Sequence, residues 1–248
     1  MSDTSSTTHF GFETVDSAAK QGRVRGVFDS VASRYDLMND LMSAGLHRLW
    51  KDRMVNTLRP PHNAIMVDLA GGTGDIAQRV KKKFGHDVLV TDVNHAMLKE
   101  GVNRAVDTAS ADGFRWSCVN AQTMPFANSS VDTLTMAFGL RNVTDIDAVL
   151  HEAMRVLKPG GQFVCLEFSP IEHGIKKKLY DAYSFNMIPK IGRMVTGDEE
   201  AYQYLVESIR MFPNAESLAK RMRDAGMARV SYETLTGGVV AIHQGWRV

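Results

Sequence analysis

The sequence predicts an α/β fold built on a mostly parallel, doubly wound sheet, and two observations predict it. From residue 64 onward, short apolar runs typical of buried strands alternate with segments whose apolar residues recur at helical spacing. A glycine-rich turn at residues 71–74 separates the first such strand from the first such helix. Alternating strands and helices form parallel sheets with right-handed crossovers. The 248 residues suit one domain of this kind.

The beginning of the chain lacks this alternation. Residues 1–20 are rich in Ser and Thr and show no periodicity, so we expect a flexible tail, although Phe10, Phe12 and Val15 could dock it. Residues 21–60 carry charged and apolar residues at helical spacing and predict a helical lead-in. We therefore expect a single domain over residues 21–248.

The alternating region predicts five strands with helices between them. Asp145 can cap the last of these helices, and the turn Pro159-Gly160-Gly161 can end it. The expected strands are residues 65–70, 88–92, 114–119, 131–138 and 163–168, and the expected helices are residues 75–84, 96–109 and 146–157.

The alternation of strands and helices stops after residue 168. Residues 170–212 are rich in Met and aromatic residues and predict a helical insertion over the ligand-binding face. A helix over residues 217–225 and a β-hairpin over residues 228–235 and 239–244 would then bring the sheet to seven strands. A nucleotide-like ligand belongs at the carboxyl ends of such strands, where the strand order reverses.

Composition excludes several classes of protein. A formal net charge of +1 argues against the broad basic surface of a nucleic-acid binder. No apolar run approaches the roughly 20 residues that cross a bilayer, and the polar start lacks the apolar region of a signal peptide. Cys118 and Cys165 each lie in an apolar run, so we expect neither disulfides nor a metal site. A cytoplasmic protein is expected.

The glycine turn predicts a binding loop. Gly72, Thr73 and Gly74 lie between a strand and a helix, where backbone amides can approach a ligand and the amino end of the helix favours negative groups. Gly72, Gly74 and Ala77 also fit the dinucleotide pattern G-x-G-x-x-A. The loop alone therefore does not separate S-adenosylmethionine from NAD.

Two carboxylates flank this loop. Asp92 ends the second strand, where it can accept hydrogen bonds from both ribose hydroxyls of an adenosine group, or merely cap the next helix. Asp68 precedes the glycines and could receive an ammonium group through water, or equally orient the loop. Both alternatives stay open at this point.

Longer motifs resemble known families. Residues 67–75 (VDLAGGTGD), 120–126 and 155–161 (RVLKPGG) resemble the motif series of class I S-adenosylmethionine-dependent methyltransferases. Further runs resemble the C-methyltransferase family of ubiquinone and menaquinone biosynthesis, and they cover the chain from about residue 20 to its end. They are residues 32–40 (ASRYDLMND), 138–143 (FGLRNV), 166–169 (LEFS), 180–186 (YDAYSFN), 202–210 (YQYLVESIR) and 237–243 (GGVVAIH).

The resemblance implies a Rossmann-like class I methyltransferase fold and S-adenosylmethionine as methyl donor, with no metal. It implies that Asn120 and Ala121 contact the adenine, although Asn120 could instead be a turn residue. The implied reaction is C-methylation of a prenylated hydroquinone ring: demethylmenaquinol, 2-methoxy-6-polyprenyl-1,4-benzoquinol, or both. Ala137 stands where the family has serine, so any contact between that serine and the donor is lost.

Candidate catalytic residues follow from the same resemblance. Arg141 could hold a developing phenolate by charge-assisted hydrogen bonds, or form an ion pair that anchors its loop. Because a guanidinium is a poor proton acceptor, water or another residue should complete the transfer. Tyr35, Asp36 and His243 are candidates, though Tyr35 could be a packed aromatic and His243 a core histidine. Asn142 contributes to the site or shapes its turn.

Partners follow from the implied substrate. Met and aromatic residues of the insertion could line a cleft for a polyprenyl tail, or form helix-packing core. The run Lys176-Lys177-Lys178 could contact anionic headgroups transiently, which would place the protein peripherally at the inner face of the membrane, or be a solvated helix face. Homodimerisation and association with other quinone-biosynthesis enzymes stay open.

Alternatives for the function of the whole chain are methylation of another small molecule, an NAD-dependent dehydrogenase and a binding module without catalysis.

Overall fold

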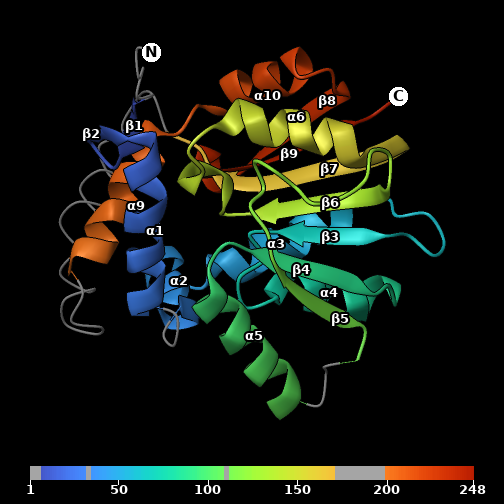
Figure 1. Cartoon of the computed structure of the whole chain (residues 1–248), viewed down its shortest axis with the longest axis horizontal. Helices are drawn as coiled ribbons and strands as arrows, with labels where there is room; N and C mark the ends of the chain where they lie inside the picture. The colour runs from blue at the N-terminus through green and yellow to red at the C-terminus, as the bar shows by residue number, and fades with distance from the viewer. Residues whose placement is uncertain (1–6, 32–34, 109–111, 171–198) are drawn as a thin grey trace.

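The central sheet of the computed structural model contains five parallel strands followed by an antiparallel hairpin (Figure 1). The structure describes residues 7–31, 35–108, 112–170 and 199–248. Within them the seven strands lie in the order β5-β4-β3-β6-β7-β9-β8. Their bounds are β3 Met66–Leu69, β4 Val88–Asp92, β5 Phe114–Cys118, β6 Val131–Ala137, β7 Leu157–Phe168, β8 Ala228–Leu235 and β9 Val240–Trp246. The predicted fold class is confirmed.

Helices cover both faces of the sheet (Figure 1). On one face, α3 (Leu46–Thr57), α4 (Asp75–Phe84) and α5 (His95–Asp107) bury apolar side chains in a cluster that includes Trp50, Met54 and Val80. On the other, α6 (Ile146–Val156) and α10 (Ala215–Asp224) pack through Leu150, Leu218 and neighbours. Because the central strands are covered on both sides, β3 is buried throughout and β6 and β7 are largely buried, with Asp68, Thr133 and Thr135 as buried polar residues among apolar ones.

The strand order reverses at β3. The chain moves from β3 outward through β4 to β5, then returns to the opposite side of β3 to form β6 and β7. β3 therefore pairs in parallel with both β4 and β6. The helices that follow these two strands, α4 after β3 and α6 after β6, pack on opposite faces of the sheet, and such a reversal is the place where these folds bind ligands.

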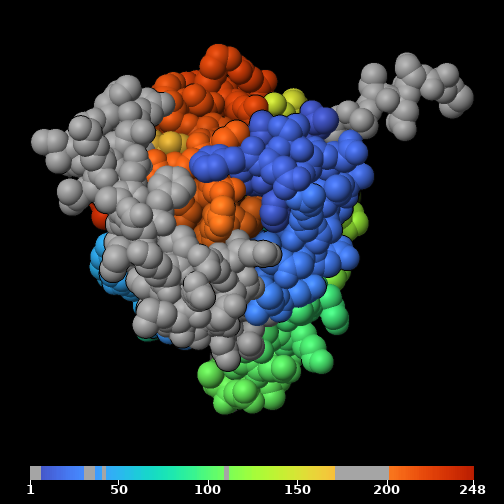
Figure 2. Space-filling view, turned by 90° about the vertical axis from the view of Figure 1, so that its left-hand side faces the viewer, coloured from blue at the N-terminus to red at the C-terminus, as the bar shows by residue number. Residues whose placement is uncertain are grey.

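The amino-terminal segment corrects one prediction. Residues 7–16 form a hairpin of β1 (Thr7–Phe10) and β2 (Glu13–Asp16), and α1 (Ser17–Val31) follows directly, where the sequence predicts a loose tail to residue 20. The hairpin lies against α9 (Glu199–Met211), as Figure 2 also shows. The Phe10 ring stacks on Tyr204 with centroids 4.2 Å apart. This long-range contact orders a segment that has no periodicity of its own.

The other boundaries follow the sequence closely. α4, β4 and β8 have the predicted bounds, and Asp145 caps α6 by accepting a hydrogen bond from the Ala148 amide. β7 starts earlier than predicted, because Leu157 already pairs with Val131 and the strand continues through Gly160, whose φ is +82°. Of the predicted insertion over residues 170–212, residues 171–198 lie outside the described part, and α9 forms its end. Among the described helices, none is long and apolar enough to cross a membrane.

Candidate active site

A cavity opens at the carboxyl ends of β3, β4 and β6. The glycine loop, the end of β4 and the turn after β6 form its walls, and α1 closes one side. Its lining includes every donor-site residue predicted from the sequence except Gly74. Its lining residues include Val24, Arg25, Phe28, Lys51, Asp68, Ala70, Gly71, Gly72, Thr73, Asp75, Asp92, Asn94, Asn120, Ala121, Phe138, Gly139 and Asn142.

The loop after β3 depends on its glycines. A Cβ on Gly71 would lie 2.6 Å from Asp68 Oδ2, and a Cβ on Gly74 would lie 2.6 Å from the Trp116 ring. Gly72 and Gly74 also have φ of +54° and +80°, a region that favours glycine. The backbone can therefore run close to both the cavity and the neighbouring strand, as a ligand-binding loop requires.

Asp92 is fixed with its carboxylate at the cavity. Its Oδ2 accepts a hydrogen bond from the Gly72 amide at 3.0 Å, and its Oδ1 accepts one from the Asn94 amide at 2.8 Å. The N-cap of α5 is Asn94, which accepts a bond from Met97, so Asp92 is not that cap. Burial raises the pKa of Asp92 to about 6, although the amide hydrogen bonds oppose the shift. Its position suits acceptance of ribose hydroxyls.

Asp68 has one carboxylate oxygen with a partner and one without. Oδ1 accepts a hydrogen bond from Thr135 Oγ1 at 2.7 Å, whereas buried Oδ2 has no partner in the described part of the chain. Burial is the main reason why the pKa of Asp68 rises to about 7. An unpartnered buried oxygen at a cavity wall is energetically costly and is ready to accept a hydrogen bond from a ligand.

Asn120 and Ala121 follow β5 and line the cavity. The Asn120 side chain accepts a hydrogen bond from the Gln122 amide at 2.9 Å, and its carbonyl accepts one from the Thr123 amide. Asn120 thus shapes a turn and also lies at the cavity, so the two interpretations left open by the sequence are compatible.

Two non-glycine residues in the cavity wall adopt left-handed backbone conformations. Ala70, after β3, has φ of +50°, and Phe138, after β6, has φ of +58°. The two turns touch, because a Cβ on Gly139 would lie 2.5 Å from the Ala70 Cβ. Such conformations are costly and cluster at functional sites. Here they bring the donor loop and the turn after β6 into contact.

Arg141 does not line the cavity, contrary to the contact expected of it. It belongs to η2 (Leu140–Asn142), and its Nη1 donates to Glu167 Oε1 at 2.8 Å and to the Phe138 carbonyl at 2.6 Å. Both side chains are buried, and the guanidinium lies over the Phe168 ring. The loop-anchoring alternative is therefore what the structure shows, because Arg141 ties the turn of Phe138 to the end of β7.

Asn142, in contrast, lines the cavity. Its Oδ1 accepts a hydrogen bond from the Tyr204 hydroxyl at 3.0 Å. Tyr204, on α9, in turn stacks on Phe10 of the amino-terminal hairpin. A chain of contacts thus runs from the hairpin through α9 to a polar side chain of the cavity.

Of the remaining proton-transfer candidates, His243 is not brought to the cavity. His243 lies on β9, buried, with its Nε2 2.8 Å from the Ala215 carbonyl oxygen, so it is a core histidine. Burial lowers its pKa, which favours the neutral ring. Tyr35 begins α2 (Tyr35–Ser43), with Asp36 next to it, but the side chains of both lie outside the described part.

Sequence reasoning missed two charged residues of the site, Lys51 and Asp75. Lys51 Nζ donates to Asp75 Oδ2 at 2.7 Å, and both side chains line the cavity. Asp75 starts α4 directly after the glycine loop, which is a signal that the motif contained. Lys51 gave no such signal, since a lysine in a helix with many charges usually faces solvent.

Comparisons with known proteins identify the family of the chain. The model of the ubiE/COQ5 methyltransferase family matches residues 16–247. The chain belongs to this family. A relative from Acidiphilium cryptum named ubiquinone/menaquinone biosynthesis C-methyltransferase UbiE is 53% identical over 249 residues, with both chains fully covered. A relative of the same name from Nitrobacter hamburgensis is 52% identical over 253 residues, also with full coverage of both.

Solved structures support the fold of this methyltransferase family. A SAM-dependent methyltransferase from Thermotoga maritima superposes with a TM-score of 0.65 at 18% identity, over 91% of this chain and all of that one. One from Aquifex aeolicus gives 0.59 at 15% identity, over 86% and 98%. The resemblance drawn from the motifs is thus confirmed, the chain is an S-adenosylmethionine-dependent methyltransferase, and the dehydrogenase and non-catalytic alternatives lose their support.

Proposed function

We propose that this protein transfers a methyl group from S-adenosylmethionine to a ring carbon of a prenylated hydroquinone. The acceptor is demethylmenaquinol, 2-methoxy-6-polyprenyl-1,4-benzoquinol, or both. The observation that carries the proposal is the identity of more than half of all positions with relatives named for this activity, over the full length of both chains. The cavity adds geometric support, because a donor loop and a separate polar turn face the same space.

The donor's place in the cavity follows from the chemistry of the lining. Asp92 accepts the ribose hydroxyls, Asn120 and Ala121 lie against the adenine, and the loop of Gly72, Thr73 and Gly74 lies along the methionyl end. The unpartnered Oδ2 of Asp68 fits an ammonium group. The bound donor supplies an electrophilic methyl group on sulfur.

The protein's task is then alignment and control of one proton. A ring carbon next to a quinol hydroxyl is nucleophilic, especially when that hydroxyl loses its proton. As this carbon bonds to the methyl group, the bond between sulfur and methyl breaks and S-adenosylhomocysteine is left. The ring carbon then loses its hydrogen as a proton, which restores the aromatic quinol. Positioning of the two reactants contributes about 7–11 kcal/mol in well-oriented systems, and proton transfer about 10²–10⁴-fold in rate. Asn142 and the backbone of the turn after β6 orient the ring, and Arg141 with Glu167 keeps that turn in shape. Tyr35 remains a candidate for proton transfer.

The polyprenyl tail places the reaction near a membrane. We propose that the protein is cytoplasmic and makes a transient contact with the inner face of the membrane. Prenylated quinols dissolve there. Homodimerisation or association with other quinone-biosynthesis enzymes is a further proposal. Its test is the molecular mass of the purified protein in solution, alone and with detergent.

The test of the function is methyl transfer to short-chain forms of both quinols. Purified protein, labelled donor and each quinol are incubated under reducing conditions, with the matching oxidised quinone as control. We expect transfer to at least one quinol and none to the quinones. Oxidation makes the ring electron-poor, so its carbons are no longer nucleophilic. Transfer to other small-molecule acceptors but to neither quinol would overturn the substrate assignment and leave the donor site standing.

A further inference from the structure

Lys51 is a buried cation in the wall of the donor cavity. It lies on the inward face of α3, and its side chain is 6% exposed. Of the cationic side chains that line the cavity in the described part of the chain, Arg25 is exposed and Lys51 is buried. Removing an ammonium group from water is costly unless it has anionic partners. The buried ammonium group of Lys51 therefore needs an anion to bind.

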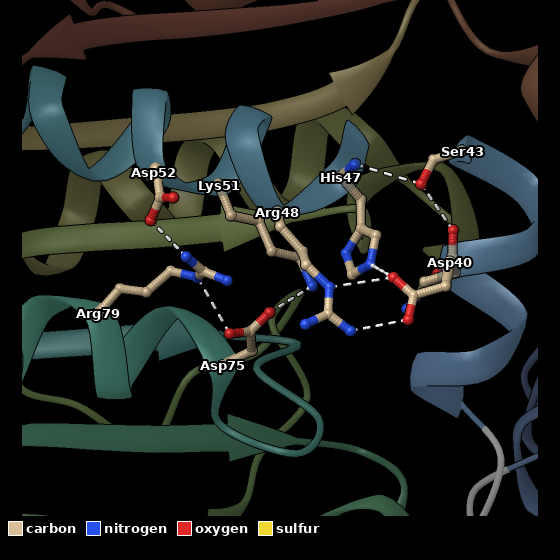
Figure 3. A network of polar contacts seen from close by, with 9 residues as sticks. Asp40, Ser43, His47, Arg48, Lys51, Asp52, Asp75 and Arg79 are labelled. Atoms are coloured by element: carbon tan, nitrogen blue, oxygen red, sulfur yellow. Dashed lines mark hydrogen bonds and ion pairs between the residues drawn. The ribbon is translucent and has the colours of Figure 1, made fainter. Parts of the chain in front are cut away.

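Its partner, Asp75, is shared. Figure 3 shows Asp75 between Lys51 on one side and Arg79 on the other. Lys51 Nζ donates to Oδ2 at 2.7 Å, and Arg79 Nε donates to Oδ1 at 3.0 Å. Burial works against ionisation of Asp75, yet the two cations hold its pKa below the ordinary value. Asp75 thus keeps a cationic partner even when Lys51 turns to another anion.

The place next to this pair suits a carboxylate. The N-cap of α4 is Gly74, which has no side chain to receive the amides of the first helical turn. These amides and the positive end of the helix favour a bound anion. Lys51 lines the same cavity as Gly71, Gly72 and Thr73, and its flexible stem can turn the ammonium group from Asp75 toward the loop.

A complementary group for a cation lies in the same wall. Asp68 is fully buried, and its Oδ2 has no hydrogen-bond partner among the residues that the structure describes. Lys51, Asp68 and Asp75 all line this cavity, and Lys51 Nζ lies 2.7 Å from Asp75 Oδ2. One cation and one carboxylate in the wall of the same cavity match the two charges of an α-amino-acid zwitterion, the terminal group of the methyl donor.

We propose that Lys51 binds the methionyl carboxylate of the donor, that Asp68 accepts a hydrogen bond from its ammonium group, and that Asp75 holds Lys51 in place before the donor arrives. The inference rests on the proposed use of S-adenosylmethionine. Lys51 then binds the amino-acid end of the donor, whereas Asp92 and Asn120 bind its nucleoside.

Two ligands separate these contributions. S-adenosylhomocysteine carries the nucleoside and the amino-acid end, whereas 5′-methylthioadenosine carries the nucleoside with no amino acid. Calorimetry with Lys51→Met should show S-adenosylhomocysteine binding weakened about 10- to 100-fold, the scale of one charge-assisted hydrogen bond. Binding of 5′-methylthioadenosine should change less than about 3-fold on the same scale. Lys51→Arg should recover part of the lost affinity.

Matched variants guard against a merely structural effect. Arg79→Met removes the other cation of Asp75 but keeps Lys51, and it should bind both ligands as the wild type does. If Lys51→Met does not fold, Lys51→Met with Asp75→Asn removes both charges of the pair and should show the same selective loss. Equal weakening of both ligands, or unchanged binding of S-adenosylhomocysteine, would overturn the role of Lys51. A wild-type protein that binds neither ligand would instead overturn the donor assignment.

Discussion

At the scale of single residues, the ion pair of Arg141 with Glu167 is the contact that most changes the interpretation of the site. Both side chains are almost fully buried, and Glu167 also accepts hydrogen bonds from the amides of Arg141 and Phe168. The motif around Arg141 marks a turn that lines the cavity, but sequence does not tell which way a long side chain points. Arg141 positions the turn, and Asn142 presents its polar group to the cavity.

Arg141→Ala should lose most turnover while retaining donor binding. The variant leaves Glu167 buried without its cation, which typically destabilises a protein by about 3–5 kcal/mol. Turnover with quinol and affinity for S-adenosylhomocysteine should be measured together with thermal unfolding. Arg141→Met with Glu167→Gln removes both charges, so it should recover stability but not turnover. Full turnover in either variant would remove the pair from the mechanism.

The buried carboxylates predict an unusual pH dependence. The pKa of Asp68 is about 7 and that of Asp92 about 6, against 3.8 as the ordinary value, with burial as the main cause. The unfolded chain releases these protons first as pH rises, so the folded state loses stability between about pH 4 and 7. The donor-free protein should therefore unfold at lower temperature at pH 7.5 than at pH 5.5, and Asp68→Asn should reduce this difference.

Donor binding should show the opposite trend. A ligand ammonium group favours the ionised form of Asp68, so affinity for S-adenosylhomocysteine should rise as Asp68 loses its proton, between about pH 6 and 8. Calorimetry across this range, with 5′-methylthioadenosine as the comparison ligand, measures the effect. A pH profile for Asp68→Asn as steep as that of the wild type would contradict the assignment.

At the scale of elements, the amino-terminal hairpin supports the cavity from outside. Phe10 stacks on Tyr204, Tyr204 donates to Asn142, and α1, which follows the hairpin, supplies Val24 and Phe28 to the cavity wall. Local sequence could not predict this hairpin, because its partner α9 lies almost two hundred positions away. Removal of the contact between Phe10 and Tyr204 should therefore change the position of Asn142 in the active site.

Phe10→Ala should destabilise the protein and raise the KM for the quinol more than that for the donor. An aromatic pair contributes about 0.5–1.5 kcal/mol, which shifts the midpoint of thermal unfolding by roughly 2–4 °C per kcal/mol in a chain of this size. Phe12→Ala is the matched control, since Phe12 is 54% exposed and its loss should change little. Equal effects of the two substitutions would show that the Phe10 stack has no special role.

At the scale of the whole molecule, the periodic part of the chain was predictable and the rest was not. Strands from Met66 to Phe168 and the closing hairpin follow from apolar runs and turn residues, and the donor site follows from its place at their carboxyl ends. Lys51 belongs to the site only because α3 packs across the sheet beside α4. That contact depends on tertiary packing, as the docking of residues 7–16 does, and neither leaves a local signature.

The architecture of the whole chain is shared with distantly related methyltransferases. Methyltransferases at 15–18% identity share this architecture, so the fold alone identifies neither the acceptor nor the atom that is methylated. The assignment to a ring carbon rests on the long, ordered match to named relatives.

The most direct test of the central claim is the position of the transferred methyl group. The protein is incubated with ¹³C-methyl donor and a reduced short-chain demethylmenaquinol or methoxy-prenyl-benzoquinol, and the product is analysed by NMR and mass spectrometry. We predict a label bonded to a ring carbon in at least one product. A label found only on oxygen, or no labelled quinol despite donor binding, would contradict C-methylation of a prenylated hydroquinone.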